Sequence, residues 1–296
     1  MKDLSNAFTF VAVAQERSFV AAANKLGMSS SAVSKAVSRL ESDLKVKLLH
    51  RTTRSVSLTP EGESYLRGIV AIANDLDNLN QYISSTNSAP FGQLKVSLPP
   101  AYGRTVVLPQ LHHFYAKYPD ITLELSFESR PINLAESSVD LVVRSNKLPD
   151  SANLVARKLS DVRQVICATP EYLARIGGID SVDDLEHHNV IVMKHASKGR
   201  RLPLQLSGNR TLTVEGNLCV DDAEAKAIAV KHGLGVGQLF EFFVEKELQD
   251  GTLVEVLPEQ RPSDIPLYIM YLDRKLVSPR IRAFIDFLDE LTKGKF

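Results

Sequence analysis

The segment formed by residues 31–44, SAVSKAVSRLESDL, constrains the fold of this chain more than any other. Val33, Val37, Leu40 and Leu44 are spaced four, three and four residues apart, so they lie on one face of a helix. Serine is only an average helix former, but short hydroxyls and a cation suit close approach to phosphates and base edges. This favours a nucleic-acid-binding helix, and an ordinary solvated face is the alternative. The opposite face carries Ser31, Ser34, Lys35, Ser38 and Ser42.

Shorter elements surround this helix. A first helix is predicted from the helical spacing of apolar residues 4, 8 and 11, and a second begins after the capping residue Ser18 and ends at Gly27. Residues 28–30 form the turn. After the serine-rich helix, the alternation of Val56 and Leu58 behind a basic stretch predicts a hairpin. Residues 19–38 are therefore predicted to form a helix-turn-helix, and the hairpin its wing.

Composition agrees with a nucleic-acid partner. Residues 1–60 hold nine Lys or Arg and four Asp or Glu, a net charge of +5, and the remaining residues carry −5. With 44% apolar and 24% charged residues, the 296-residue chain is typical of globular proteins with two or three folding units. It has no apolar run of membrane-spanning length and no convincing signal peptide, and its two cysteines form no paired framework. A cytoplasmic location without membrane contact is expected.

The N-terminal motif resembles that of LysR-type transcriptional regulators. It shares a double alanine at 21–22, a serine opening the recognition helix at position 29, and the Leu-Glu pair 40–41. It departs from the family at Ser30, where glutamine is usual, and at Leu49, where an aromatic residue is usual. Glutamine pairs bidentately with adenine, whereas serine reads bases less selectively, so the sequence does not specify the base read at this position. The resemblance implies DNA contacts from Ser29, Ser30, Ser31, Ser34, Lys35, Ser38, Arg39, Arg51 and Arg54.

A long helix is predicted next. Thr59, Pro60 and Glu61 supply a capping hydroxyl, a proline at the first position and an acid near the positive helix end. A heptad-like apolar seam of about two repeats follows, and residues 84–92 form a linker. Two repeats alone also fit a helix that packs on its own domain. The family resemblance implies a dimerising helix instead, with the seam formed by Ile69, Ile72, Leu76, Leu79 and Ile83.

The remainder, residues 92–296, alternates short strands with helices, which predicts an α/β domain with mainly parallel pairing. It resembles the family's effector-binding domain over nearly its whole length. That implies two α/β lobes similar to periplasmic solute-binding proteins, the first from residues 92–161 and 266–296, the second from residues 162–265. The expected plan is a winged helix-turn-helix domain (1–60), a linker helix and hinge (61–91) and the effector-binding domain.

A small-molecule site is expected in the cleft between the lobes. Residues 100–104 are placed before a helix N-terminus, and Arg144 follows a buried strand, so both suit an anionic group. Structural salt bridges at the two arginines and simple N-capping by the paired aspartates are the alternatives. The expected effector is a small anionic metabolite. Its contacts are assigned to Pro100, Ala101, Tyr102, Gly103, Arg104, Arg144, Ser145, Asp221 and Asp222.

Other motifs indicate no chemistry. The pairs His112-His113 and His187-His188 point to different sides of their helices, which disfavours a metal. The run HGLGVG at 232–237 follows a helix and precedes a strand, the reverse of a dinucleotide loop. Neither a catalytic motif nor a cofactor is expected.

We therefore expect a transcription factor rather than an enzyme, with promoter DNA, a small-molecule effector and RNA polymerase as partners. The resemblance implies a homotetramer, a dimer of dimers. The alternative is a solute-binding or enzymatic α/β protein with an incidental basic N-terminal domain.

Overall fold

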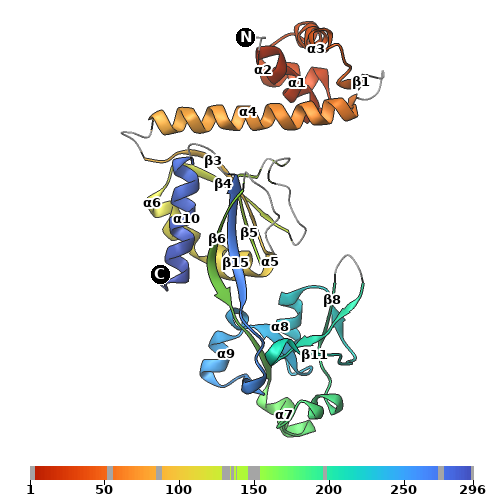
Figure 1. Ribbon diagram of the computed structural model, residues 1–296, viewed down its shortest axis with the longest axis vertical. Coiled ribbons are helices and arrows are strands. Elements are labelled where there is room, and N and C mark those ends of the chain that lie inside the picture. The colour runs from red at the N-terminus through yellow and green to blue at the C-terminus, as the bar shows by residue number, and fades with distance from the viewer. Residues whose placement is uncertain are drawn as a thin grey trace.

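The computed structural model places three parts along the longest axis of the molecule (Figure 1). A small helical domain and the long helix α4 lie at one end, and two α/β lobes follow. No helix among the described residues is both long and apolar enough to cross a membrane. The structure describes residues 4–51, 56–84, 89–128, 134, 137, 139–145, 154–195, 199–272 and 277–294.

The N-terminal domain is the predicted helix-turn-helix with a two-stranded wing. Its elements are α1 (Leu4–Glu16), α2 (Phe19–Leu26), α3 (Ser30–Leu44), β1 (Leu49–Arg51) and β2 (Val56–Leu58), the two strands pairing antiparallel. The side chain of Ser18 accepts a hydrogen bond from the Ala21 amide, and Gly27 ends α2 with φ 63°, as expected. One boundary differs, because α3 already begins at Ser30. The apolar stripe of α3 packs against α1 and α2 around Phe10.

A buried carboxylate fixes the wing to α3. Glu41 is 3% exposed, and its Oε1 accepts hydrogen bonds from the amides of Leu48 (3.0 Å) and Leu49 (3.2 Å). Its Oε2 accepts from the exposed Nζ of Lys47 at 2.9 Å. Two backbone donors at the start of β1 are thereby satisfied inside the domain, so the direction in which the chain enters the wing is set by α3.

Thr59 fixes the other end of the wing. Its Oγ1 donates to the carbonyl of Lys47 at 2.7 Å and accepts from the Gly62 amide at 2.9 Å, which caps α4 (Pro60–Ser84). Gly62 itself must lack a side chain, because a Cβ there would lie 2.0 Å from the carbonyl oxygen of Leu48. The wing therefore connects α3 and α4 through close backbone contacts.

The first lobe is a five-stranded sheet in the order β4-β3-β5-β15-β6. Strands β3, β4 and β5 pair parallel, but β15 pairs antiparallel with both β5 and β6. The expectation of mainly parallel pairing is therefore wrong, because β15 returns from the second lobe against strands that run the other way. The strands are β3 (Gly92–Leu98), β4 (Ile121–Phe127), β5 (Leu141–Arg144), β6 (Leu154–Val162) and β15 (Ile265–Leu272).

Helices cover this sheet around a core that includes Phe114, Phe284 and Phe287. One helical stretch follows β3 directly and starts at Pro100, with proline in the first position. Residues 100–104 therefore form its first turns, and the expectation that they precede the helix is wrong. This stretch comprises α5 (Pro100–Tyr102), the π-helical turn η1 (Gly103–Val107), η2 (Leu108–Gln110) and α6 (Leu111–Lys117), and α10 (Pro279–Thr292) is the C-terminal helix.

The second lobe contains small sheets with the orders β13-β7-β14, β12-β8-β9 and β10-β11. The strands are β7 (Gln164–Ala168), β8 (Val192–Lys194), β9 (Arg201–Leu202), β10 (Leu204–Gln205), β11 (Thr211–Leu212), β12 (Cys219–Val220), β13 (Gly237–Phe240) and β14 (Val254–Val256). The helices are α7 (Pro170–Ile176), η3 (Asp183–His187), η4 (Ser207–Asn209), α8 (Ala223–Lys231), η5 (Glu241–Phe243), α9 (Glu245–Asp250) and η6 (Pro258–Gln260).

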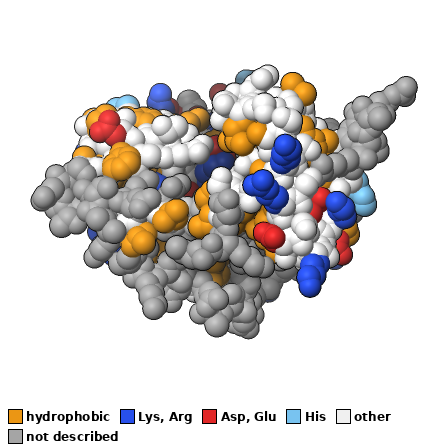
Figure 2. Space-filling view, turned by 90° about the horizontal axis from the view of Figure 1, so that it is seen from above, with side chains coloured by type: hydrophobic (Ala, Val, Ile, Leu, Met, Phe, Trp, Pro, Cys, Tyr) orange, Lys and Arg blue, Asp and Glu red, His pale blue; other side chains and the backbone are white. Residues whose placement is uncertain are grey.

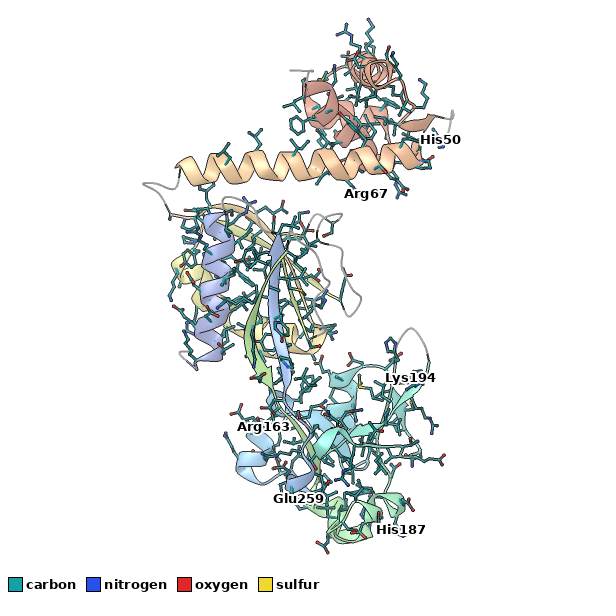
Figure 3. The ribbon with its side chains drawn as sticks, in the orientation of Figure 1. His50, Arg67, Arg163, His187, Lys194 and Glu259 are labelled. Carbon is teal, nitrogen blue, oxygen red and sulfur yellow. The ribbon has the colours of Figure 1, made fainter. Side chains whose placement is uncertain are left out.

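The chain passes between the lobes twice, through the long paired strands β6 and β15. Arg163 lies at this waist (Figure 3). Its guanidinium is 3.3 Å from Glu241, the first residue of η5, and 3.9 Å from Asp264, the residue before β15. Two antiparallel strands with a charged cluster thus join the lobes.

The buried Glu41 carboxylate generates a stability prediction. Glu41→Ala leaves two buried amides without an acceptor, so we expect a loss of about 3 kcal/mol in the free energy of unfolding of the N-terminal domain. Urea denaturation followed by circular dichroism measures it. Lys47→Ala is the matched control, because it removes only the exposed partner and is expected to cost less than about 1 kcal/mol. Equal effects of the two variants would contradict the assignment.

Candidate DNA-binding, dimerisation and effector surfaces

The serine-rich face of α3 is open to solvent. The residues assigned to DNA contact from Ser29 to Arg39 are exposed, except Ser34, which is half-buried. The view from above shows Lys and Arg side chains amid surface that is neither charged nor hydrophobic on the side of the N-terminal domain (Figure 2). The polar surface expected from sequence is therefore accessible for a large partner.

Ser29, which was assigned to DNA contact, also caps α3. Its side chain accepts a hydrogen bond from the Ala32 amide at 3.2 Å and lies 3.1 Å from the Ser31 hydroxyl, so it caps α3. Ser30 is the first residue of the helix and is exposed. Free backbone N–H groups in the first turn of a helix favour an anion such as phosphate.

The wing is described only in part. Arg51 is the last residue of β1 and pairs with Val56 on β2. The Arg51 side chain and the whole of Arg54 lie outside the described residues. His50, exposed beside Arg51, marks where the wing lies next to the start of α4 (Figure 3).

The seam of α4 divides into a buried start and an exposed continuation. Ile69 is buried, whereas Ile72, Leu76 and Leu79 are 51%, 44% and 43% exposed. The Ile83 side chain lies outside the described residues. Packing on its own domain therefore accounts only for the first turns of α4, where Tyr65 and Leu66 contact the N-terminal core.

An apolar groove continues this stripe. It has a volume of about 330 Å³ and lies between α1, α3 and α4. Its walls include Leu4, Ala7, Leu44, Tyr65 and Ile72. Leu4 and Leu44 are themselves exposed, at 42% and 36%. The groove and the exposed part of the α4 stripe share Ile72.

Residues 101 and 102 connect the two lobes. Tyr102 is buried, and its ring meets Phe242 of η5 edge-on with centroids 6.1 Å apart. Burial raises the pKa of Tyr102 to about 12, so its phenol stays protonated at neutral pH. Ala101 packs against the core of the second lobe. Both residues therefore contribute apolar contact between the lobes.

Arg104 forms an ion pair across the lobes. Its guanidinium lies 3.1 Å from the carboxylate of Glu224, which is in the first turn of α8. Both side chains are 44% exposed. This pair fits the alternative interpretation of Arg104, a structural salt bridge, with Glu224 as its partner. It joins the helix after β3 to the second lobe.

Arg144 is buried without a carboxylate partner among the described residues. One terminal nitrogen donates to the Val143 carbonyl at 2.7 Å and the other to the Ser97 hydroxyl at 2.9 Å, while Nε has no partner in the described part of the chain. Desolvation lowers the pKa of Arg144, and the charge of Glu128 opposes that shift. The guanidinium retains an unused donor. Ser145, next to it, is exposed.

The paired aspartates have different surroundings. The Asp222 side chain accepts a hydrogen bond from the Ala225 amide at 2.8 Å and so caps α8, as the alternative interpretation held. Asp221 is exposed beside it. The two aspartates and Glu224 make this end of α8 acidic, facing the arginine of the first lobe.

A cavity in the second lobe was not expected from sequence. It has a volume of about 230 Å³ and includes Lys226, whose side chain is 5% exposed. The segment AEAKAIAVK places this lysine in a helix, and a lysine normally faces water. Only the alternation of small residues around it hinted that the helix is buried on more than one side.

The described His, Cys, Asp and Glu side chains were also considered as metal ligands or redox groups. No group of three or more His, Cys, Asp or Glu side chains gathers as a metal site within the ranges that the structure describes. His187 lies at the far end of the second lobe (Figure 3). Cys167 is buried, and burial raises its thiol pKa to about 12, which keeps it an unreactive thiol.

Comparisons with known proteins agree on both parts of the chain. The family model "LysR substrate binding domain" matches residues 87–293, and "Bacterial regulatory helix-turn-helix protein, lysR family" matches residues 4–63. An HTH-type transcriptional repressor of Pseudomonas aeruginosa is 34% identical over 294 residues, covering 98% of this chain and 92% of that protein. The regulator CrgA of Neisseria meningitidis is 34% identical over 293 residues, covering 98% and 97%.

Solved structures give the same result. The structure of CrgA, at 31% identity, covers 98% of this chain and 99% of that chain with a TM-score of 0.62. ArgP from Mycobacterium tuberculosis, at 20% identity, shares the fold with a TM-score of 0.71 and coverages of 99% and 98%.

A winged helix-turn-helix joined by a long helix to a two-lobed α/β domain defines a DNA-binding regulator that responds to a small molecule. The chain belongs to the LysR family of transcriptional regulators, with a DNA-binding and an effector-binding domain. Regulators of this family bind DNA and small-molecule effectors and form oligomers. The alternative that the basic N-terminal unit is incidental is wrong, because that unit is itself the family's DNA-binding domain.

Proposed function

We propose that this regulator acts in the cytoplasm on promoter DNA as a dimer of dimers, without catalysing a reaction, and that a small anionic effector between its lobes controls it. The observation that carries the proposal is the pairing of two exposed surfaces on one rigid unit. The Ser-Lys face of α3 is open to DNA, and the apolar stripe of α4 is open to a second copy.

Short hydroxyls on α3 allow the helix backbone to approach the major groove closely, so hydrogen bonds reach base edges without long side chains. In this proposal Ser30, Ser31 and Ser34 meet bases, while Lys35 and Arg39 meet phosphates or guanine edges. Arg51 and Arg54 reach the backbone beside the wing. Two such helices must be held about one helical turn of DNA apart, which the α4 stripe supports by joining two chains.

The effector is proposed to meet the first lobe at Arg144 and the residues that begin the helix after β3. Arg144 has an unused buried donor, and no carboxylate neutralises it by an ion pair within the described residues. An anionic ligand would supply that charge. Because Arg104 and Glu224 already pair across the lobes, a ligand that competes for this arginine would change how the lobes are held. Contacts of the assembled dimers with RNA polymerase belong to the same proposal.

The DNA surface is tested by removing single cations. We expect Lys35→Ala and Arg51→Ala each to weaken binding to a promoter-containing fragment, and Arg51→Ala to reduce the slope of log affinity against log salt by about 1, because one phosphate contact is lost. Fluorescence anisotropy over a salt series measures both quantities. Lys117→Ala, in the first lobe, is the control and should change neither. An unchanged affinity and slope for Arg51→Ala would reject the wing contact.

Operator preference is expected to depend on the serines rather than on the cations. Ser31→Ala and Ser34→Ala should alter the ratio of affinities for different operators more than the affinity for unrelated DNA, because they touch bases and carry no charge in this proposal. Competition between the promoter fragment and random DNA, measured by the same anisotropy assay, distinguishes the two effects. A uniform loss on both DNAs would instead place these serines against phosphates.

The dimer surface is tested at Leu76. Leu76→Asp would bury a carboxylate without a partner in the seam, which costs several kcal/mol, so the measured molecular mass should fall by at least half. Light scattering after size exclusion measures it, and DNA affinity should fall in parallel. Arg67→Asp is the matched control. At 100° per residue Arg67 is about 180° from Leu76, and its side chain projects away from the N-terminal domain (Figure 3). An unchanged mass for Leu76→Asp would exclude α4 as the interface.

The effector contact is tested at Arg144 in the full chain. A panel of small mono- and dicarboxylates, screened by thermal shift, should contain compounds that stabilise the wild type and change its DNA affinity. Arg144→Ala is expected to abolish both responses while effector-free DNA binding remains, and Arg144→Lys should retain part of them. Responses undiminished in Arg144→Ala would reject the contact, and unfolding of that variant would assign Arg144 a structural role.

A further inference from the structure

Lys226 is a buried cation that nothing so far described employs. It lies on α8 one turn after Ala223, and its side chain is 5% exposed. Desolvation lowers the pKa of its ammonium group to about 8, and the nearby Cys167 opposes that shift only in part. Burial without compensation therefore disfavours the charged form of this lysine.

No protein group neutralises Lys226 in the described part of the chain. No carboxylate lies within ion-pair distance of its Nζ, and no hydrogen bond to it is formed by the described residues. Lys231, on the same helix, shows the usual arrangement, because its Nζ lies 2.6 Å from Glu247. Buried ammonium groups are otherwise paired, since an isolated buried charge is strongly unfavourable. The missing partner points to a group from outside the described residues.

Lys226 borders the cavity of about 230 Å³ in the second lobe. Strand β13 packs closely on α8 beside it, because a Cβ at Gly237 would lie 2.5 Å from Val230, whereas the Lys226 Cε would be in ordinary contact at 3.4 Å. The remaining walls are mainly apolar. They come from β8 and the residue before it, from β9, from β10, from the segment after β11 and from β13, and include Ile191, Leu202, Leu204, Val214 and Leu239.

The side-chain amide of Gln238, in the cavity wall, is hydrogen-bonded to the backbone. Gln238 accepts from the Gln205 amide at 2.9 Å and donates to the Gln205 carbonyl at 2.6 Å, which ties β13 to β10. Its side chain is thus committed to the backbone and does not solvate the ammonium. Among the described residues that line the cavity, Lys226 is the only charged one, so the cavity is mainly apolar with one cation in its wall.

We propose that this cavity binds a small monocarboxylate with a compact apolar body, whose carboxylate pairs with Lys226. An engineered apolar cavity of about 150 Å³ holds benzene, so the larger volume here suits a body of roughly six to nine heavy atoms. Every described lining residue lies between residues 164 and 240. The site therefore belongs to the second lobe alone and is distinct from the proposed contacts at Arg104 and Arg144.

Helix α8 gives this site a connection to the rest of the molecule. The same helix carries Glu224, which pairs with Arg104 of the first lobe, two residues before Lys226. A ligand held by Lys226 would fix the position of α8 and hence of the ion pair between the lobes. This regulatory consequence rests on the proposed function, whereas binding in the cavity does not.

The test uses the full chain with three probes, hexanoate, cyclopentanecarboxylate and phenylacetate, and the corresponding primary amides as uncharged controls. At millimolar concentration and pH 7, we expect at least one carboxylate to raise the midpoint of thermal unfolding and its amide not to do so. Lys226→Met should abolish the shift and lower the affinity measured by calorimetry at least tenfold. Lys231→Met, which removes a paired lysine from the same helix, should leave the affinity within about twofold.

Lys226→Met keeps the length and the apolar stem of the side chain, so the variant should fold at least as stably as the wild type without ligand. A shift by the amides equal to that by the carboxylates overturns the proposal, as does an unchanged carboxylate shift in Lys226→Met or no shift by any probe. Loss of the response in Arg144→Ala but not in Lys226→Met would support the site between the lobes and reject this one. The reverse result would support the cavity and reject the contact at Arg144.

Discussion

The hydrogen bonds from the Leu48 and Leu49 amides to the buried carboxylate of Glu41 hold together the part of the molecule that meets DNA. They join the end of α3 to the first strand of the wing, and Thr59 joins the far side of the wing to α4. The recognition helix, the wing and the long helix therefore form one rigid unit. A dimer contact on α4 would then determine where both recognition helices lie, because these hydrogen bonds connect α4 to the wing and the wing to α3.

The effector-binding domain depends on a different device. Strands β6 and β15 form a long antiparallel pair in the sheet of the first lobe, and the chain enters and leaves the second lobe from the adjacent ends Val162 and Ile265 of this pair. Away from these strands, the contact is made by few groups, among them the Tyr102–Phe242 ring pair and the Arg104–Glu224 ion pair. Exposed ion pairs contribute little to stability. A ligand that changes one of them therefore needs only a modest difference in affinity to change how the lobes are held.

Two buried cations, Arg144 and Lys226, lie in different lobes and share one physical situation. Each is removed from water, and in each case the pKa is lowered by desolvation. Neither forms an ion pair with a carboxylate in the portion of the chain that the structure describes. A folded protein tolerates such groups when a binding partner supplies the missing charge. Burial and the missing partners, rather than residue type, are therefore the reason for proposing an anion in each lobe.

The sequence by itself determined the local elements and the family. The spacing of Val33, Val37 and Leu40 follows from helix geometry, so the sequence predicts the recognition helix. The caps at Ser18 and Gly27 depend only on neighbouring residues, so the sequence also predicts where α2 begins and ends. Tertiary structure alone decided the antiparallel position of β15, the burial of Glu41 and the pairing of Arg104 with Glu224, which lie 120 residues apart. It also decided that Lys226 is buried, because a lysine in a helix gives no local sign of what packs over it. Contacts between distant segments depend on how the elements of each lobe pack together, and the local spacing of residue types along the chain does not predict that packing.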